Sequence, residues 1–174
     1  MGLDNLNNEA VELLENYCSF VIGAKPSGLR MLPESDGLKL IAGDGMGGCF
    51  YEWHIDGSEE SAIVYLTQYG ETSRIANNIE EIITLVINCE EWCDALTAAH
   101  KSKDITERVI NDKRYDEEWK ESSDRLKEII PIENIDLVEM LLDVVNAEPK
   151  FCPQLLSEDG LSSARSFKER PYPA

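Results

Sequence analysis

Residues 38–87, LKLIAGDGMGGCFYEWHIDGSEESAIVYLTQYGETSRIANNIEEIITLVI, decide the fold of this chain. Short apolar or alternating runs at residues 38–42, 49–55, 62–66 and 72–76 predict four strands, because turn residues separate them. The links are too short for crossover helices, so neighbouring strands must be antiparallel. The run at 62–66 is the most apolar of the four, which predicts a central strand.

The strand over residues 49–55 alternates enough to assign its two faces. We expect its apolar side chains to point inward, namely Cys49, Tyr51, Trp53 and Ile55. We expect the polar side chains to point outward, namely Glu52, His54 and Asp56. These outward positions are therefore candidates for contact with a partner.

A helix is expected directly after the fourth strand. Asn78 has the character of an N-cap, and Glu81 three positions on completes a pattern like a capping box. One continuous apolar stripe follows, made of Ile79, Ile82, Ile83, Val86 and Ile87. The spacing predicts a helix that lies across the inner face of the sheet.

The rest of the chain is predicted to be mainly helical. Residues 7–21 have amphipathic spacing. Asp104 with Glu107 predicts another helix start, and the apolar spacing then continues through Tyr115, Trp119, Leu126 and Ile129 until Pro131. A last apolar stripe covers residues 137–145.

Together these elements predict a single α+β domain over residues 1–156. We expect a curved antiparallel sheet of about four to six strands, packed by helices, with extra C-terminal helices. The best-defined core is residues 38–87, and the helical extension is residues 98–156. Residues 157–174 are polar and end in prolines, which predicts a loose tail.

The charge is strongly negative and unevenly distributed. The 174 residues carry a net charge of −18. Residues 1–98 hold 17 acids and 4 bases, whereas residues 99–174 hold 17 acids and 12 bases. Such a field repels nucleic acid and anionic membranes and attracts basic partners. The same charge could instead serve only to keep the protein soluble. A basic partner and simple solubility both stay open as explanations.

Composition also bears on the compartment. The first ten residues have neither a basic region nor an apolar one, so we expect no signal peptide. The apolar runs are too short for a membrane span. The five cysteines show no paired spacing, which argues against a disulfide framework. A cytoplasmic location fits best.

Two motifs resemble ligand-binding sites, but each has a simpler explanation as part of the fold. Gly43, Gly45 and Gly48 satisfy GxGxxG, but an alternating strand follows them where a dinucleotide site requires a helix N-terminus. A hairpin turn is expected instead. Cys89 and Cys93 lie four apart, on what we expect to be one helix, but no further ligands show zinc spacing. We therefore expect no cofactor and no metal.

An enzymatic interpretation would have to use His54. The chain has two histidines, and His100 falls in an expected linker. Glu52, His54 and Asp56 occupy alternate positions and could carry out acid–base chemistry. A solvated strand face is the commoner reason for such a pattern. We therefore expect no enzyme activity.

Three quoted segments together carry a family resemblance. LIAGDGMGGCFY at residues 40–51 is similar to the signature of the SUKH superfamily, in which an apolar strand, an acidic-glycine turn and an aromatic strand follow one another. That family includes the yeast cell-wall-synthesis regulator domain. IVYL at 63–66 resembles its next strand, and IANNIEEII at 75–83 resembles its closing segment. The resemblance covers about fifty residues, and residues 98–174 match nothing in it.

The resemblance implies an α+β fold and a non-catalytic role. Bacterial domains of this kind look like immunity proteins that bind and neutralise a cognate toxin, often one that attacks nucleic acid. The implied partner is a basic protein toxin, with no direct contact to nucleic acid or membrane. Binding residues in the family vary with the toxin, so none is carried over by position.

Candidate partner contacts therefore come from the outward polar positions and nearby loops alone: Asp44, Glu52, His54, Asp56, Glu59 and Glu60. The alternative function is a regulatory or scaffold domain of the same fold that binds protein but has no toxin partner. The oligomeric state and the toxin's identity stay open.

Overall fold

A computed structural model describes most of the chain, namely residues 2–24, 37–112, 116–132, 134–151, 153–157 and 160–167. The helices are η1 Leu3–Asn5, α1 Asn8–Tyr17, α2 Ile79–Asn88, α3 Trp92–Ala99, α4 Lys103–Ile110, α5 Glu117–Ile129 and α6 Leu137–Asn146. The strands are β1 Val21–Ile22, β2 Leu38–Gly43, β3 Cys49–His54, β4 Ser61–Leu66, β5 Glu71–Ala76, β6 Gln154–Ser157, β7 Gly160–Ser163 and β8 Arg165–Ser166.

The main sheet has six strands in the order β1-β2-β3-β4-β5-β8. The strands β1 to β5 pair antiparallel with their neighbours, and β4 is internal, as the sequence predicts. The short β8 differs because it pairs parallel to β5, so the sheet is mixed. The predicted α+β fold with a four- to six-stranded sheet and C-terminal helices is confirmed.

The glycine-rich connection between β2 and β3 is a tight turn, as expected. Gly45 has φ of 77° and Gly47 has φ of 102°, a backbone region that glycine adopts without steric cost. Gly43 pairs with Cys49 across the turn, and β3 follows at once. A dinucleotide would need a helix N-terminus at this point, and the chain places a strand there.

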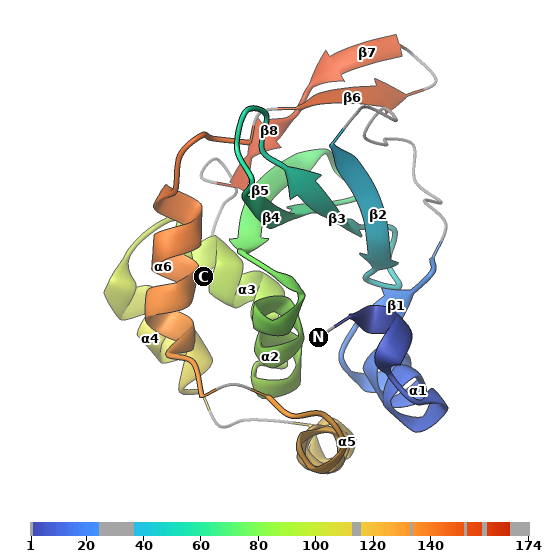
Figure 1. Ribbon diagram of the computed structural model, residues 1–174. Helices are drawn as coiled ribbons and strands as arrows, with labels where there is room; N and C mark the ends of the chain where they lie inside the picture. The colour runs from blue at the N-terminus through green and yellow to red at the C-terminus, as the bar shows by residue number, and fades with distance from the viewer. Residues whose placement is uncertain are drawn as a thin grey trace.

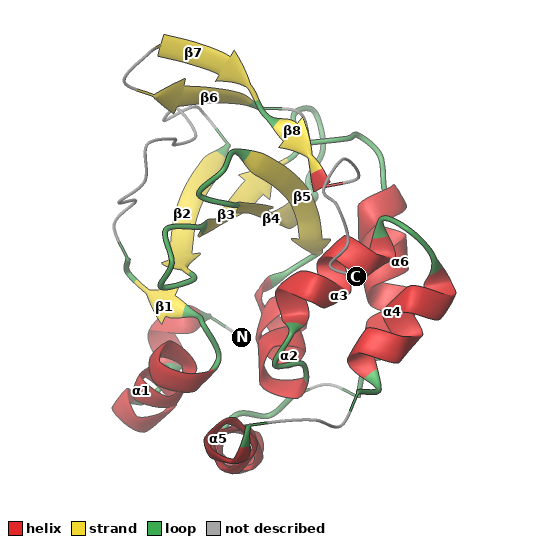
Figure 2. Ribbon diagram, turned by 180° about the vertical axis from the view of Figure 1, so that it is seen from behind, coloured by secondary structure: helices red, strands yellow, loops and turns green. Residues whose placement is uncertain are grey.

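The helices lie on one side of the sheet, and the β6–β7 hairpin lies on the other (Figures 1 and 2). Asn78 caps α2 as predicted, since its side chain accepts a hydrogen bond from the Glu81 backbone N–H at 2.9 Å. The apolar stripe of α2 is buried in the main core together with Phe50, Ile63 and Ile75 of the sheet.

The predicted alternation of β3 is right about burial, since Cys49 and Tyr51 are buried and His54 is exposed, but wrong about which face meets the helices. Phe50 is fully buried in the helix-side core, so the alternate residues Cys49, Tyr51 and Trp53 lie on the opposite face. That second face forms its own apolar cluster, to which the C-terminal segment contributes Leu155. Both faces of the sheet are therefore covered, which period-2 alternation in one strand cannot reveal.

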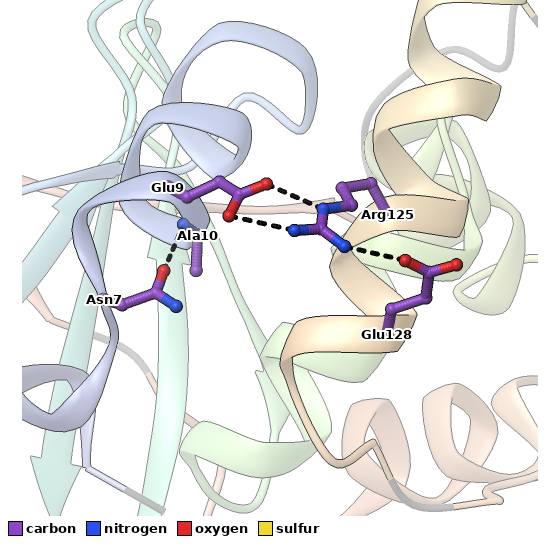
Figure 3. A network of polar contacts seen from close by, with 5 residues as sticks. All are labelled: Asn7, Glu9, Ala10, Arg125 and Glu128. Atoms are coloured by element: carbon purple, nitrogen blue, oxygen red, sulfur yellow. Dashed lines mark hydrogen bonds and ion pairs between the residues drawn. The ribbon is translucent and has the colours of Figure 1, made fainter.

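Helix α1 is tied to α5 across the surface of the helical layer (Figure 3). The Arg125 guanidinium donates two hydrogen bonds to the Glu9 carboxylate, at 2.7 and 3.1 Å, and a third to Glu128 at 2.8 Å. The hydrogen bond from Arg125 is the main cause that lowers the pKa of Glu9. This contact joins residues 116 positions apart in the chain.

Two predicted boundaries need correction. The helix expected to run from Asp104 to Ile129 is two helices, because Asn111 ends α4 and the Asp116 side chain caps α5. Tyr115 lies outside the described residues. The predicted tail from residue 157 is wrong for residues 160–167, which form β7 and β8 and end in the fully buried Phe167.

Candidate functional site

The β3–β4 hairpin gathers most of the predicted partner residues at one end of the sheet. Its turn is held by the Ile55 N–H, which donates to the Glu60 carbonyl at 3.1 Å, and by the Glu60 N–H, which donates to the Ser58 hydroxyl at 3.0 Å. Ile55 is buried, so the turn is anchored to the domain. The side chains of Asp56, Glu59 and Glu60 are left exposed.

Glu52 and His54 lie on the last half of β3, next to this turn. Glu52 is half-buried and sits opposite Lys39 on β2, so a base lies on the neighbouring strand. His54 is exposed, and its backbone N–H donates to the Gly37 carbonyl at 2.7 Å. We define the acidic hairpin as Glu52, His54, Asp56, Glu59 and Glu60.

The acid–base interpretation of this cluster gains no geometric support. In the described part of the chain the His54 ring has no side-chain hydrogen bond, to Glu52, to Asp56 or to any other group. A working general base is usually oriented by such a bond.

Asp44 does not belong to this surface, which corrects its prediction as a partner contact. It precedes β3 and is therefore separated from the hairpin by the length of that strand, about 20 Å at ~3.4 Å per residue. Asp44 is 5% exposed, and its carboxylate accepts hydrogen bonds from the backbone N–H groups of Met46 at 2.7 Å and Gly48 at 2.8 Å, and from the Tyr65 hydroxyl at 2.5 Å. Asp44 thus holds the glycine turn together.

The acidic hairpin lies in a long segment with no exposed base. Residues 40–100 contain eleven acids and one base, Arg74. Arg74 is only 7% exposed, so it adds little to the surface potential. The hairpin therefore presents negative charge with Lys39 as its nearest exposed base along the chain.

Cys89 and Cys93 do not lie on one helix, contrary to the expectation from their spacing. Cys89 follows the last residue of α2, whereas Cys93 lies within α3, so the two are not on one helix. Burial raises the pKa of Cys89 to about 12, which makes it a poor thiolate ligand. Among the residues that the structure describes, no three His, Cys, Asp or Glu side chains gather closely enough to hold a metal ion.

Sequence reasoning missed a cavity between β5, the end of α6 and β8. Its wall includes Arg74, His100, Lys150 and Arg165, which are far apart in the sequence. His100 lies in the short connection between α3 and α4, as expected, where it is the C-cap of α3, and its Nε2 lies 2.8 Å from the Ser73 hydroxyl. Arg74 is the one base among residues 40–100, and that isolation is the signal that could have pointed here.

The described helices include none with the length and apolar character needed to cross a bilayer. No protein-family model matches the chain, and neither a curated protein nor a solved structure matches it.

Proposed function

We propose that this chain is a non-catalytic immunity protein, which binds a cognate bacterial toxin through the acidic hairpin and thereby neutralises it. The observation that carries the proposal is the acidic hairpin itself. Three exposed carboxylates, Asp56, Glu59 and Glu60, stand on an anchored turn in a segment whose one base is buried. The similarity of residues 40–83 to the SUKH signature supports the same role.

The physical basis is electrostatic complementarity. A toxin that attacks nucleic acid presents a basic cleft to its substrate, and an acidic inhibitor is steered towards that cleft. The net charge of −18 strengthens this steering at a distance, and salt screens it over roughly 8 Å at physiological ionic strength. Binding therefore needs no cofactor and no chemistry on the part of this chain.

We also place the protein in the cytoplasm, where such a toxin meets nucleic acid. Four described cysteines are free thiols, namely Cys18, Cys49, Cys89 and Cys93. Free thiols are typical of a reducing compartment. The free thiols and the proposed toxin partner together support a cytoplasmic location.

The direct test is to capture the partner from the native host with the tagged full chain. Two variants serve as matched baits, each with three carboxylates replaced by amides. The hairpin variant carries Asp56→Asn, Glu59→Gln and Glu60→Gln. The helix variant carries Glu117→Gln, Glu118→Gln and Glu121→Gln, which are exposed on α5.

The proposal expects a basic toxin that wild type and the helix variant retain and the hairpin variant loses. Co-expression of wild type with that toxin should restore growth of the host cells. Capture of a non-toxic partner by the same hairpin would instead favour the regulatory or scaffold function. Equal capture by the hairpin variant would exclude the acidic hairpin as the binding site.

A further inference from the structure

The cavity between β5, α6 and β8 gathers positive charge in a strongly acidic protein. Its volume is about 240 Å³. Arg74 of β5, Lys150 after α6 and Arg165 of β8 all line it. Elsewhere the segment of residues 40–100 has no base at all. Three cations from three separate elements therefore meet around one small space.

Arg74 is the most unusual of the three because it is buried without a charged partner. Arg74 is 7% exposed, and among the described residues its Nε–H finds no hydrogen-bond acceptor. Its Nη1 donates one long hydrogen bond, 3.4 Å, to the Glu148 carbonyl, and the guanidinium lies 5.9 Å from the centre of the Trp53 ring. A buried guanidinium with so few acceptors is costly unless something else pairs with it.

The carboxylates nearest to Arg74 do not pair with its guanidinium. Burial is the main influence on the pKa of Arg74 and lowers it, while the more distant carboxylates of Glu60 and Glu148 raise it. In the described part of the chain, neither carboxylate reaches ion-pair distance from the guanidinium. The Glu148 carboxylate lies instead 3.8 Å from Lys150 Nζ.

The two other cations are at the exposed side of the cavity and already have partners. Lys150 Nζ donates to the Val145 carbonyl at 3.1 Å, and Arg165 Nη2 donates to the Tyr69 carbonyl at 3.0 Å. Arg165 also lies 3.6 Å from the Glu71 carboxylate. Both retain positive charge near the cavity, but among these three cations the described residues leave a buried donor without an acceptor only at Arg74 Nε.

Beside Arg74, the polar side chains of Ser73 and His100 are held by hydrogen bonds. The Ser73 hydroxyl donates its one proton to the Arg74 carbonyl at 2.7 Å, so His100 Nε2, 2.8 Å away, must act as the donor to Ser73. The His100 ring stacks on the fully buried Phe167 at 6.1 Å. Most of the remaining wall is apolar and comes from Val144, Val145 and Phe151.

We propose that this cavity binds a small organic carboxylate. The carboxylate accepts hydrogen bonds from the Arg74 guanidinium, whose planar fork matches that group, and the apolar body of the ligand lies against the wall formed by α6 and Phe151. The size suits a single ring, since an apolar cavity of ~150 Å³ already admits benzene. None of the residues that line this cavity belongs to the acidic hairpin, although the Glu60 carboxylate acts on Arg74 from a distance, and the proposal does not depend on a toxin partner.

The test uses benzoate as the probe and benzamide as its uncharged counterpart of the same shape. Calorimetry at neutral pH should show that benzoate binds the full chain at least tenfold more tightly than benzamide. In the NMR spectrum of wild type, benzoate should shift the Arg74 Nε–H signal. Equal binding of the two probes, or benzoate binding that leaves this signal unmoved, would overturn the proposal.

Variants test whether benzoate binds at Arg74 in this cavity. Arg74→Gln should lose the preference for benzoate, while the control Arg108→Gln, on the exposed face of α4, should keep it. If Arg74→Gln does not fold, Ala147→Leu fills the cavity from its wall and leaves Arg74 in place. Retention of wild-type benzoate affinity in Ala147→Leu would likewise overturn the proposal.

Discussion

Replacing Asp44 should show that this residue stabilises the fold and does not contact a partner. Asp44→Ala removes the acceptor of three hydrogen bonds, two of which come from buried residues, through the Gly48 N–H and the Tyr65 hydroxyl. Hydrogen bonds to a charged group are worth roughly 1.5–3 kcal/mol, so the expected loss of unfolding free energy is about 4 kcal/mol. In a domain of this size that lowers Tm by roughly 10 °C.

Urea unfolding measures this loss directly, provided that the slope m is unchanged. Tyr65→Phe should cost about 2 kcal/mol, because it leaves one Asp44 oxygen unpaired in a buried site. The double variant should then cost less than the sum of the two single variants. Asp56→Asn, in the exposed hairpin, should change stability by less than about 0.5 kcal/mol. A cost below about 1 kcal/mol for Asp44→Ala would refute the structural role.

Three further predictions concern packing and charge. Phe167→Ala should destabilise the domain by about 3 kcal/mol in urea unfolding, because the ring is fully buried; a loose tail would show no change. The buried thiols of Cys18 and Cys89, whose pKa burial raises to about 12, should react with DTNB only after unfolding, and fast reaction of either in native protein would contradict their placement. Arg125→Gln should lower stability in low salt but not in high salt, since the pair with Glu9 is exposed. Because that pair lowers the pKa of Glu9, its contribution is present above the ordinary carboxyl pKa and should disappear as the pH falls through the lowered value.

Local patterns were enough to predict the centre of the fold. Strand alternation, turn glycines and the Asn78 cap are encoded within a few residues, and β2 to β5 and α2 follow from them. Whether a strand face meets helices or another segment depends on distant residues. Phe50 and Tyr51 are both large aromatic residues, so alternation alone does not tell which of them faces the helices; in the structure Phe50 does, and Tyr51 packs in the cluster that includes Leu155.

Helix α3 and the C-terminal strands were missed for different reasons. Trp92, Ala95, Leu96 and Ala99 have helical spacing, so α3 was detectable from sequence. The strands β7 and β8 are short and polar, and β8 forms only by pairing with β5. Tertiary contact, rather than local propensity, creates such elements.

The candidate site was predictable only in part. The hairpin acids follow a strand and flank a Gly turn, which places them outside the core from sequence alone. Asp44 has the same residue type and also follows a strand, but Tyr65, 21 positions away, draws it into a buried network. The Arg74 cavity needs β5, α6 and β8 together, so no local pattern could define it.

The central claim is that the acidic hairpin binds a basic partner. The dissociation constant of the captured partner, measured for wild type, the hairpin variant and the helix variant at one salt concentration, tests it most directly. Both variants lose the same charge, so long-range steering changes alike and only local contact differs. We predict that the hairpin variant binds at least tenfold more weakly while the helix variant stays within about twofold of wild type. Equal weakening of both variants, or wild-type affinity in the hairpin variant, would contradict the account.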